Sequence, residues 1–296
     1  MKQNFLRPYG LFWLIVFSSC ARLEEEAFRE HPHTNTSTRE ENECRGSLNH
    51  GVSFYLANVV VEAPGHNCSA FCDQNKAVNG IRGSGFLNGS LDVFSLDNSS
   101  SSGACGGASS HLILRWAGKK IINGSGPDFI VYENGFYIGE NPTNRFMDLL
   151  IVEVSNDKTR WCGFNPNYTH RPETIYSRDP QYWQRFAGKT PVNYNQEDST
   201  RNYSIAELFQ DNDHNGEGDL GGGDLFDLDA LSDNNYWDTG CTASLRDELK
   251  TSGFIYLRLV PAARRINPDT GSFFVTDSMS NGPDIDGVLA RYVENE

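Results

Sequence analysis

The residues best placed to do chemistry in this sequence are the oxygen-bearing side chains of residues 211–219, which read DNDHNGEGD. Oxygen ligands at alternate positions of a short loop converge on one hard cation where a glycine, here Gly216, lets the chain turn sharply. We therefore predict a structural Ca²⁺ site in this loop. The expected ligands are the side chains of Asp211, Asp213, Asn215 and Asp219 and the main-chain carbonyl of Glu217.

The predicted site is not an EF-hand. Its twelfth position holds Gly222 instead of a bidentate glutamate, and no helical pattern flanks the loop. Asp224, two residues further along, is the expected substitute ligand. Residues 211–238 contain nine acidic side chains and no lysine or arginine, so a bound cation would offset their mutual repulsion. The alternative is a solvated acidic loop in which salt screens that repulsion.

A second group of acidic residues, Asp128, Asp284 and Asp286, lies at a repeated turn sequence. Gly-Pro-Asp occurs at residues 126–128 and again at residues 282–284. Asp284 and Asp286 are two residues apart, so they would share one face of a strand. If the two turns are neighbours, the three carboxylates form a second cation site. We favour the alternative, in which these aspartates cap their own turns.

Motifs for catalysis are scarce. No Gly-x-Ser-x-Gly nucleophile motif occurs, and the glycines at 221–223 are not followed by the Lys-Ser/Thr of a phosphate-binding loop. Carboxylates are numerous enough for a glycoside hydrolase, and Asp128 with Glu153 is the pair to test. We therefore favour a binding module over an enzyme and keep a glycoside hydrolase as the alternative.

Residues 1–19 have the pattern of a signal peptide. Lys2 and Arg7 precede an apolar run at residues 11–17 that is too short to span a bilayer. The run ends in Phe-Ser-Ser-Cys, which is similar to a bacterial lipobox and makes Cys20 the expected lipid attachment site. Acyl chains such as palmitate would hold the mature chain in the cell envelope, at the outer membrane or cell surface. The alternative is an ordinary signal peptide in which Cys20 has no role.

Residues 20–43 are an expected disordered, acidic tether, because they contain too few apolar residues to offset the entropy of ordering. Residues 44–296 contain no linker-like segment and predict a single domain. An even number of cysteines in an exported chain predicts disulfides, in any of fifteen pairings. The candidates are Cys44, Cys68, Cys72, Cys105, Cys162 and Cys241.

The net charge of the chain is −14, from 25 basic and 39 acidic residues. Nucleic-acid binding relies on lysine and arginine patches that contact phosphates, so this charge argues against a nucleic-acid partner. The same charge argues against adsorption to anionic lipid and favours cations or basic protein partners.

Short runs of β-branched and aromatic residues, separated by Gly, Asn, Asp and Ser, predict an all-β fold. Strands are expected at residues 52–62, 91–96, 111–116, 129–132, 149–154, 254–260, 272–276 and 288–293. Asn134-Gly135 predicts a tight turn after the strand at 129–132. Short helices are expected at 204–209, with Ser204 and Glu207 as a capping box, and at 225–231. The pattern is typical of a β-sandwich or jelly roll, galactose-binding-like, with long loops.

Five sequence pieces occur in the order of a known family. They are GSLDVFSL at 89–96, GPDFIVYENGF at 126–136, VEVS at 152–155 followed by Trp161, GGDLFDL at 222–228 and DIDGV at 284–288. Over residues 79–293 the chain resembles a family of bacterial, spirochaete-type cell-surface lipoproteins. The resemblance implies an exported β-rich domain and no known activity. Asn-Gly-Ser at 123–125 and Gly287 depart from the family pattern, which has an acidic turn and an alanine there.

These features together predict a membrane-anchored surface protein that acts as a binding module. The expected ligand is a carbohydrate or an extracellular protein such as a host-matrix protein, by analogy with other sandwich folds.

Overall fold

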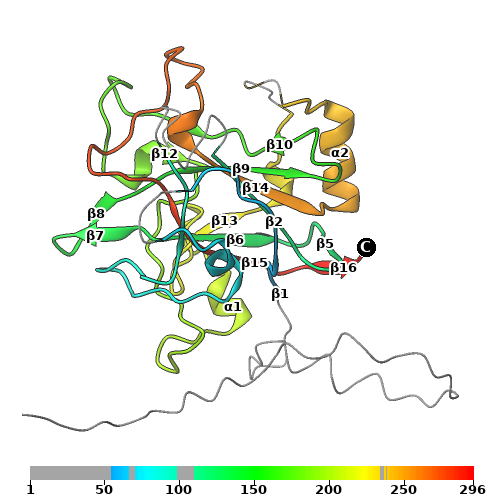
Figure 1. The fold of residues 1–296 in the computed structure, drawn as a ribbon, viewed down its shortest axis with the longest axis horizontal. Helices are drawn as coiled ribbons and strands as arrows, with labels where there is room; N and C mark the ends of the chain where they lie inside the picture. Colours follow the sequence, from blue (N-terminus) through cyan, green and yellow to red (C-terminus); the bar gives the residue numbers. More distant parts are fainter. Residues whose placement is uncertain (1–54, 67–70, 99–109, 234–236, 238) are drawn as a thin grey trace, which may run out of the picture. The chain divides into compact units, whose positions relative to one another are not determined.

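The computed structural model describes residues 55–66, 71–98, 110–233, 237 and 239–296 (Figure 1). Residues 48–296 belong to one compact unit. The predicted signal peptide, lipid attachment site and tether, and three of the six cysteines, lie outside the described residues. These are residues 1–43 with Cys20, and Cys44, Cys68 and Cys105. Within the described ranges, no helix is long and apolar enough to cross a membrane.

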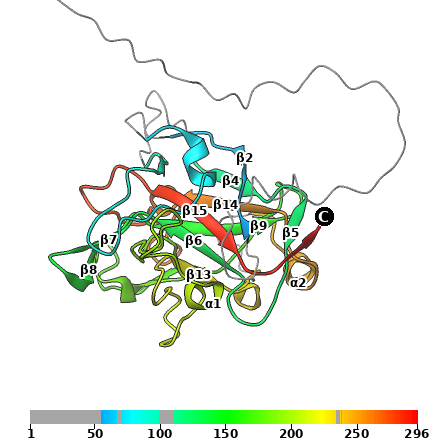
Figure 2. The ribbon, with the colours of Figure 1, turned by 90° about the horizontal axis from the view of Figure 1, so that it is seen from below.

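The fold is all-β and is built from two five-stranded antiparallel sheets (Figure 1). In the first sheet the order is β1 (Tyr55–Leu56), β15 (Asp284–Ala290), β6 (Phe129–Glu133) and β13 (Asp224–Phe226), and β3 (Phe94–Ser95) pairs with the start of β15. In the second the order is β10 (Cys162–Gly163), β9 (Leu150–Ser155), β14 (Tyr256–Pro261), β4 (Leu112–Arg115) and β2 (Val59–Glu62). Figure 2 shows β15 running alongside β6.

Smaller elements surround the two sheets. Three two-stranded pairs are β5 (Lys119–Ile121) with β16 (Val293–Asn295), β7 (Phe136–Ile138) with β8 (Asn141–Phe146), and β11 (Asn167–Tyr168) with β12 (Trp183–Gln184). The α-helices are α1 (Ile205–Leu208) and α2 (Ala243–Ser252). Short 3₁₀ turns are η1 (Gln74–Val78), η2 (Pro180–Tyr182), η3 (Leu228–Ala230) and η4 (Ala262–Arg264).

The two sheets face each other across one hydrophobic core. Alternate residues of β6, Phe129 and Val131, point into this core together with Leu257 and Leu259 of β14. The other face of β6 is covered too, because Ile130 and Tyr132 pack with residues of α1. A third cluster around Trp183 covers the outer face of the second sheet. Strand β6 is therefore buried on both faces, which explains the apolar run that precedes Glu133.

Most of the expected strands are confirmed, and the short helix at 204–209 is present as α1. The side chain of Ser204 accepts from the Glu207 backbone N–H, and the Glu207 carboxylate accepts from the Ser204 backbone N–H, as expected of a capping box. The predicted helix at 225–231 was wrong, since its first residues form strand β13 and only η3 is helical. The predicted strand at 272–276 was also wrong, because Phe273 forms only an isolated bridge with Ile266.

The turn expected at Asn134-Gly135 does not fold β6 back on itself. The chain continues into β7, which pairs with β8 outside the two main sheets. The Asn134 side chain instead holds a distant loop, because its carboxamide oxygen accepts from the Ser90 N–H and its nitrogen donates to the Ser90 carbonyl over 2.9 Å. This exchange of two hydrogen bonds fixes residues 89–90 against the end of β6.

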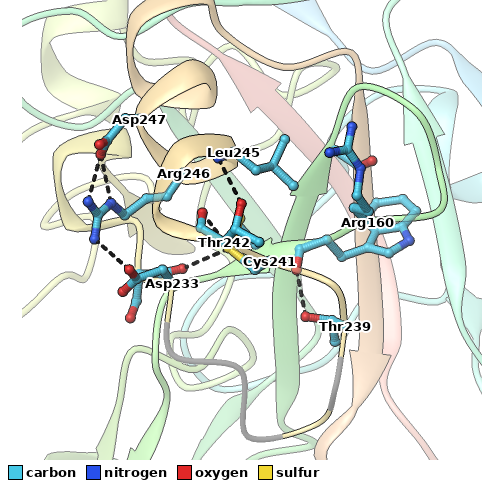
Figure 3. The surroundings of a disulfide bond; sticks show 12 residues. Arg160, Asp233, Thr239, Cys241, Thr242, Leu245, Arg246 and Asp247 are labelled. Atoms are coloured by element: carbon cyan, nitrogen blue, oxygen red, sulfur yellow. Dashed lines mark hydrogen bonds and ion pairs between the residues drawn. A yellow bond between two sulfur atoms is a disulfide. The ribbon is translucent and has the colours of Figure 1, made fainter.

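One disulfide of the described region joins Cys162 of β10 to Cys241, with the two Cα atoms 5.0 Å apart (Figure 3). It secures α2 to the edge of the second sheet, since Cys241 directly precedes Thr242, the N-cap of α2. Among the described cysteines, Cys72 is an exposed free thiol, so the structure contradicts the disulfide predicted for it.

Candidate metal centre

The loop at residues 211–219 brings three of its carboxylates together. One oxygen each from Asp211, Asp213 and Asp219 lies within 4.8 Å of the others. Ca²⁺ binds oxygen ligands at about 2.3–2.6 Å, so oxygens at this separation can share one ion. The loop follows α1, and the Asp219 N–H donates to the carbonyl of Gln210 over 3.0 Å, which closes its two ends.

Backbone hydrogen bonds shape the loop so that these side chains point inward. The carboxylate of Asp211 accepts from the N–H groups of Asn215 and Gly216, each over 3.0 Å. The carboxylate of Asp219 accepts from the Asn212 N–H over 3.0 Å. Gly216 has a φ of 79°, a left-handed conformation that glycine adopts without steric cost. Hydrogen bonds between residues of the loop itself therefore set its shape.

Asn215 has a structural part in this arrangement. Its amide nitrogen donates to the carboxylate of Asp213 over 3.0 Å, and its amide oxygen accepts from the Glu217 N–H over 2.8 Å. The oxygen that was expected to bind the ion is thus engaged in closing the turn. The three aspartates remain as the group whose carboxylate oxygens converge.

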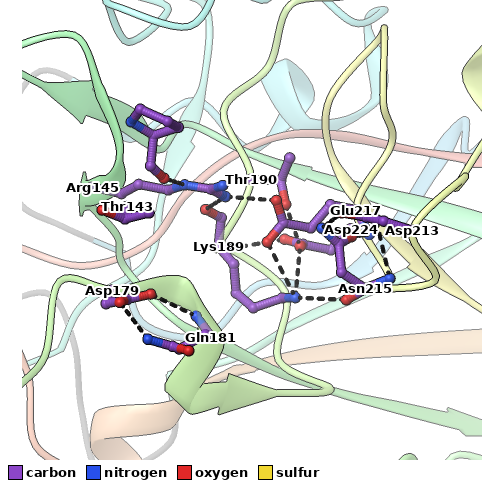
Figure 4. Close-up of polar contacts among 12 residues, drawn as sticks. Thr143, Arg145, Asp179, Gln181, Lys189, Thr190, Asp213, Asn215, Glu217 and Asp224 are labelled. Atoms are coloured by element: carbon purple, nitrogen blue, oxygen red, sulfur yellow. Dashed lines mark hydrogen bonds and ion pairs between the residues drawn. The ribbon is translucent and has the colours of Figure 1, made fainter.

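Asp224 is not a ligand of this loop, in contrast to the prediction. It is 1 % exposed, and one of its oxygens accepts from the N–H groups of Gly188 and Lys189 over 2.7 and 3.0 Å. The other oxygen accepts from the Thr190 hydroxyl over 2.7 Å (Figure 4). Burial raises the pKa of Asp224 to about 6, although the nearby Lys189 ammonium opposes that rise. Asp224 therefore anchors residues 188–190 to β13.

The side chain of Glu217 belongs to a charged network with Arg145 and Lys189 (Figure 4). Its carboxylate lies 2.8 Å from the Arg145 guanidinium of β8 and 3.7 Å from the Lys189 ammonium. The Lys189 ammonium also donates to the carbonyl of Asn215 over 3.5 Å. Sequence reasoning missed Arg145 and Lys189, because nothing local in the sequence connects them to the loop.

The loop is also joined to the first sheet through main-chain contacts. The Leu225 N–H donates to the carbonyl of Gly216 over 2.9 Å, and Glu217 forms an isolated bridge with Asp224. Because β13 is bonded to the central strand β6, the candidate metal loop stands on a rigid support. Sites on rigid elements hold their ligands more closely to one geometry.

The second acidic group is not brought together. Asp128 precedes Phe129, which pairs with Ala290 at one end of the β6–β15 ladder, whereas Asp284 lies beside Glu133 at the other end. The carboxylate of Asp128 accepts from the N–H groups of Gly124 and Leu228, over 2.7 and 2.8 Å. The hypothesis of a shared cation site for these aspartates was therefore wrong.

Asp284 and Asp286 also take different partners. The Asp284 carboxylate accepts from the Ser95 hydroxyl, and both oxygens of Asp286 accept from the Arg82 N–H over 3.0 and 3.1 Å. A register shift between Ile285 and Gly287 leaves Asp286 without a strand partner on β6, so the simple two-residue alternation does not apply there.

The acid pair considered for glycoside hydrolysis is buried and divided between the sheets. Asp128, directly before β6 of the first sheet, is 0 % exposed, and Glu153, on β9 of the second sheet, is 1 % exposed. Glu153 forms ion pairs with Arg258 and Arg265, over 2.7 and 3.1 Å. Neither carboxylate is open to a sugar or to the water that hydrolysis consumes.

No protein-family model, curated protein or solved structure gives a significant match to the chain.

Proposed function

We propose that this chain is a surface-exposed binding module in which the loop at residues 211–219 binds Ca²⁺. The convergence of the Asp211, Asp213 and Asp219 carboxylates carries this proposal. Ca²⁺ takes six to eight oxygen ligands, so three aspartates leave coordination positions for water or for oxygens of a ligand. The net charge of −14 supports a cation as a required partner.

The proposed ligand is a carbohydrate or an extracellular protein, and the chain is proposed to be held at the cell envelope by lipid on Cys20. Support comes from the signal-like residues 1–19 and from the motif resemblance at residues 126–136. Hydrolysis through Asp128 and Glu153 is not proposed, since both carboxylates are buried and bonded to other groups.

A glycan array and a panel of extracellular-matrix proteins, each probed in Ca²⁺ and in chelator, test this function. We expect binding in Ca²⁺ that is lost in chelator and lost in the variant Asp211→Ala with Asp213→Ala. Asp198→Ala is the matched control, because it removes an aspartate that only caps the turn at residues 198–201. Binding that is equal in Ca²⁺ and in chelator would reject the calcium-dependent module.

A further inference from the structure

Two buried carboxylates near the end of β6 each have one oxygen without a hydrogen-bond partner. Glu133 is 2 % exposed and Asp148, just before β9, is 4 % exposed. One oxygen of each, Oε2 of Glu133 and Oδ1 of Asp148, is buried without a hydrogen bond. The second oxygen of Glu133 accepts from the Asp284 N–H over 3.0 Å, which fixes the side chain. An unpaired buried carboxylate oxygen is unfavourable unless its negative charge is neutralised, as for other buried charges.

The free oxygen of Glu133 faces a place lined by main-chain carbonyls. A Cβ atom added to Gly188 would lie 2.3 Å from the carbonyl oxygen of Asp148 and 3.3 Å from Oε2 of Glu133. A Cβ added to Gly135 would lie 3.2 Å from the Phe146 carbonyl, 3.5 Å from the Gly188 carbonyl and 3.7 Å from the same Oε2. A side chain at Gly188 would clash with the Asp148 carbonyl, so the absence of side chains at the two glycines lets main-chain carbonyls lie close to the free oxygen of Glu133.

Acidic side chains outnumber basic ones around Glu133 and Asp148. The carboxylate charge of Asp284 repels the charges of both Glu133 and Asp148, and the charge of Asp277 repels that of Asp148. The nearby Arg178 guanidinium is bound to Asp277 over 2.7 Å. Within the described residues, no basic side chain forms an ion pair with Glu133, Asp148 or Asp284.

The pKa values of these acids reflect the same imbalance. Burial, with repulsion from Asp148, raises the pKa of Glu133 well above its usual range. Burial raises the pKa of Asp148 to about 7, against a hydrogen bond from Ser280. A positive ion beside both groups would remove this penalty, because an opposite charge nearby favours the ionised carboxylate.

We propose that Glu133 and Asp148 bind one buried Ca²⁺ ion, with main-chain carbonyls near Gly135 and Gly188 as further ligands. Carboxylates combined with carbonyls form the ligand set of Ca²⁺, whereas Mg²⁺ keeps several of its waters and zinc selects histidine and cysteine. The ion is separate from the loop site, whose aspartates belong to residues 211–219.

The buried ion would join the two sheets. Glu133 ends β6 of the first sheet, Asp148 leads into β9 of the second, and Gly188 belongs to the segment that Asp224 anchors to β13. An ion bound only by the folded state raises the free energy of unfolding as its concentration rises. Its role is therefore structural and differs from that of an exposed ligand-binding ion.

The test counts bound Ca²⁺ in four proteins that combine the two sites. They are the wild type, the loop variant Asp211→Ala with Asp213→Ala, Glu133→Gln, and the three changes together. Each protein is unfolded in the presence of chelator to remove bound ions and is then refolded in Ca²⁺. Gel filtration removes the excess ion, and atomic emission measures the Ca²⁺ that remains bound per chain. We expect two, one, one and no ions per chain, respectively. Thermal melts in Ca²⁺ and in chelator accompany the counts.

Glutamine suits this test because its amide oxygen can still accept from the Asp284 N–H, while its NH₂ group replaces the free carboxylate oxygen. In chelator, we expect the Tm of Glu133→Gln to match or exceed that of the wild type. In Ca²⁺, we expect Glu133→Gln to lose the rise in Tm that the loop variant still shows. Asp148→Asn is the second variant, in case Glu133→Gln does not fold. A loop variant that retains no ion overturns the proposal, as does a triple variant that retains one. A failure of the loop site alone would appear as an unchanged count in the loop variant.

Discussion

The carboxylate of Glu217 and the guanidinium of Arg145 form an ion pair of 2.8 Å in which both side chains are mostly buried, at 13 % and 8 % exposed. The pair connects the loop that carries the three aspartates to strand β8. The Arg145 guanidinium also donates to the carbonyl of Lys189 over 2.8 Å, so it fixes a third segment. The position of the loop thus depends on a residue 72 positions away in the sequence.

Arg145→Met should destabilise the protein, because it leaves Glu217 nearly buried beside only the more distant Lys189. Removing one partner of a buried ion pair costs about 3–5 kcal/mol. We expect the double variant with Glu217→Gln to be more stable than Arg145→Met alone, since no unpaired carboxylate remains. Urea unfolding of the wild type, both single variants and the double variant measures the coupling. Strictly additive effects would contradict an energetic link between the two side chains.

Calcium should stabilise the wild type through the loop. At a hundredfold excess over the dissociation constant the gain in unfolding free energy is about 2.7 kcal/mol, a rise of several degrees in Tm for a domain of this size. Thermal melts in Ca²⁺ and in chelator measure it, and Asp211→Ala with Asp213→Ala should reduce the difference. Mg²⁺ should substitute poorly, since it demands a smaller octahedral site. Identical responses of the loop variant and the wild type would leave the loop as a solvated acidic surface.

Asp224→Asn should lower stability and leave calcium binding by the loop intact. The amide NH₂ of the variant cannot accept from the Thr190 hydroxyl as the wild-type oxygen does, and it would face the Lys189 ammonium, which lies 3.8 Å from that oxygen. Hydrogen bonds to charged groups contribute about 1.5–3 kcal/mol each, so we expect a loss of that order. Calorimetric titration with Ca²⁺ should give the wild-type stoichiometry. If the variant bound one Ca²⁺ fewer than the wild type, Asp224 would be a Ca²⁺ ligand after all.

Stability in chelator should fall as the pH rises from about 4 to 8, with Asp286 among the causes. Burial and the charge of Asp92 raise its pKa from 3.8 to about 8, while hydrogen bonding from the Arg82 backbone and the Arg82 charge oppose the rise. The folded state then binds more protons than the unfolded state between these values, so unfolding becomes easier as the pH increases. Above pH 8 this contribution levels off.

Asp286→Asn isolates that contribution, because a single amide oxygen can still accept from the Arg82 N–H. The variant should be less pH-dependent and more stable than the wild type at pH 8. Denaturant unfolding from pH 4 to pH 9 measures both. If the unfolding free energy changed equally with pH in the two proteins, the pKa of Asp286 would not differ between the folded and unfolded states. Burial raises the pKa of Asp128 to about 7, so some pH dependence of the same sign should remain in the variant.

Cys20→Ala should abolish lipid attachment in a bacterial host that processes lipoproteins. The wild type should incorporate labelled palmitate and partition into detergent, because acyl chains confer membrane binding. Cys72→Ala is the matched control, as it removes an exposed free thiol elsewhere in the chain. Normal labelling of the Cys20 variant would reject the lipoprotein interpretation.

The sequence by itself determined the all-β class and most strand positions. Strands such as β6 and β9 are short, apolar and bounded by turn residues, and this information is local. The capping box of α1 was equally readable, because Ser204 and Glu207 are three residues apart. The convergence of Asp211, Asp213 and Asp219 also follows from a short segment, since its own backbone hydrogen bonds turn it.

Only the tertiary structure decided which partners are contacted by acids that lie far apart in the sequence. Asp128 and Asp284 lie in matching turn sequences, but the antiparallel register of β6 and β15 puts them at opposite ends. Asp224 looked like a loop ligand and instead anchors residues 188–190. Glu133 was visible only as one charge in an apolar run, and Asp148 carried no local signal. The surroundings of such acids are set by register and packing between distant segments, which no local sequence pattern encodes.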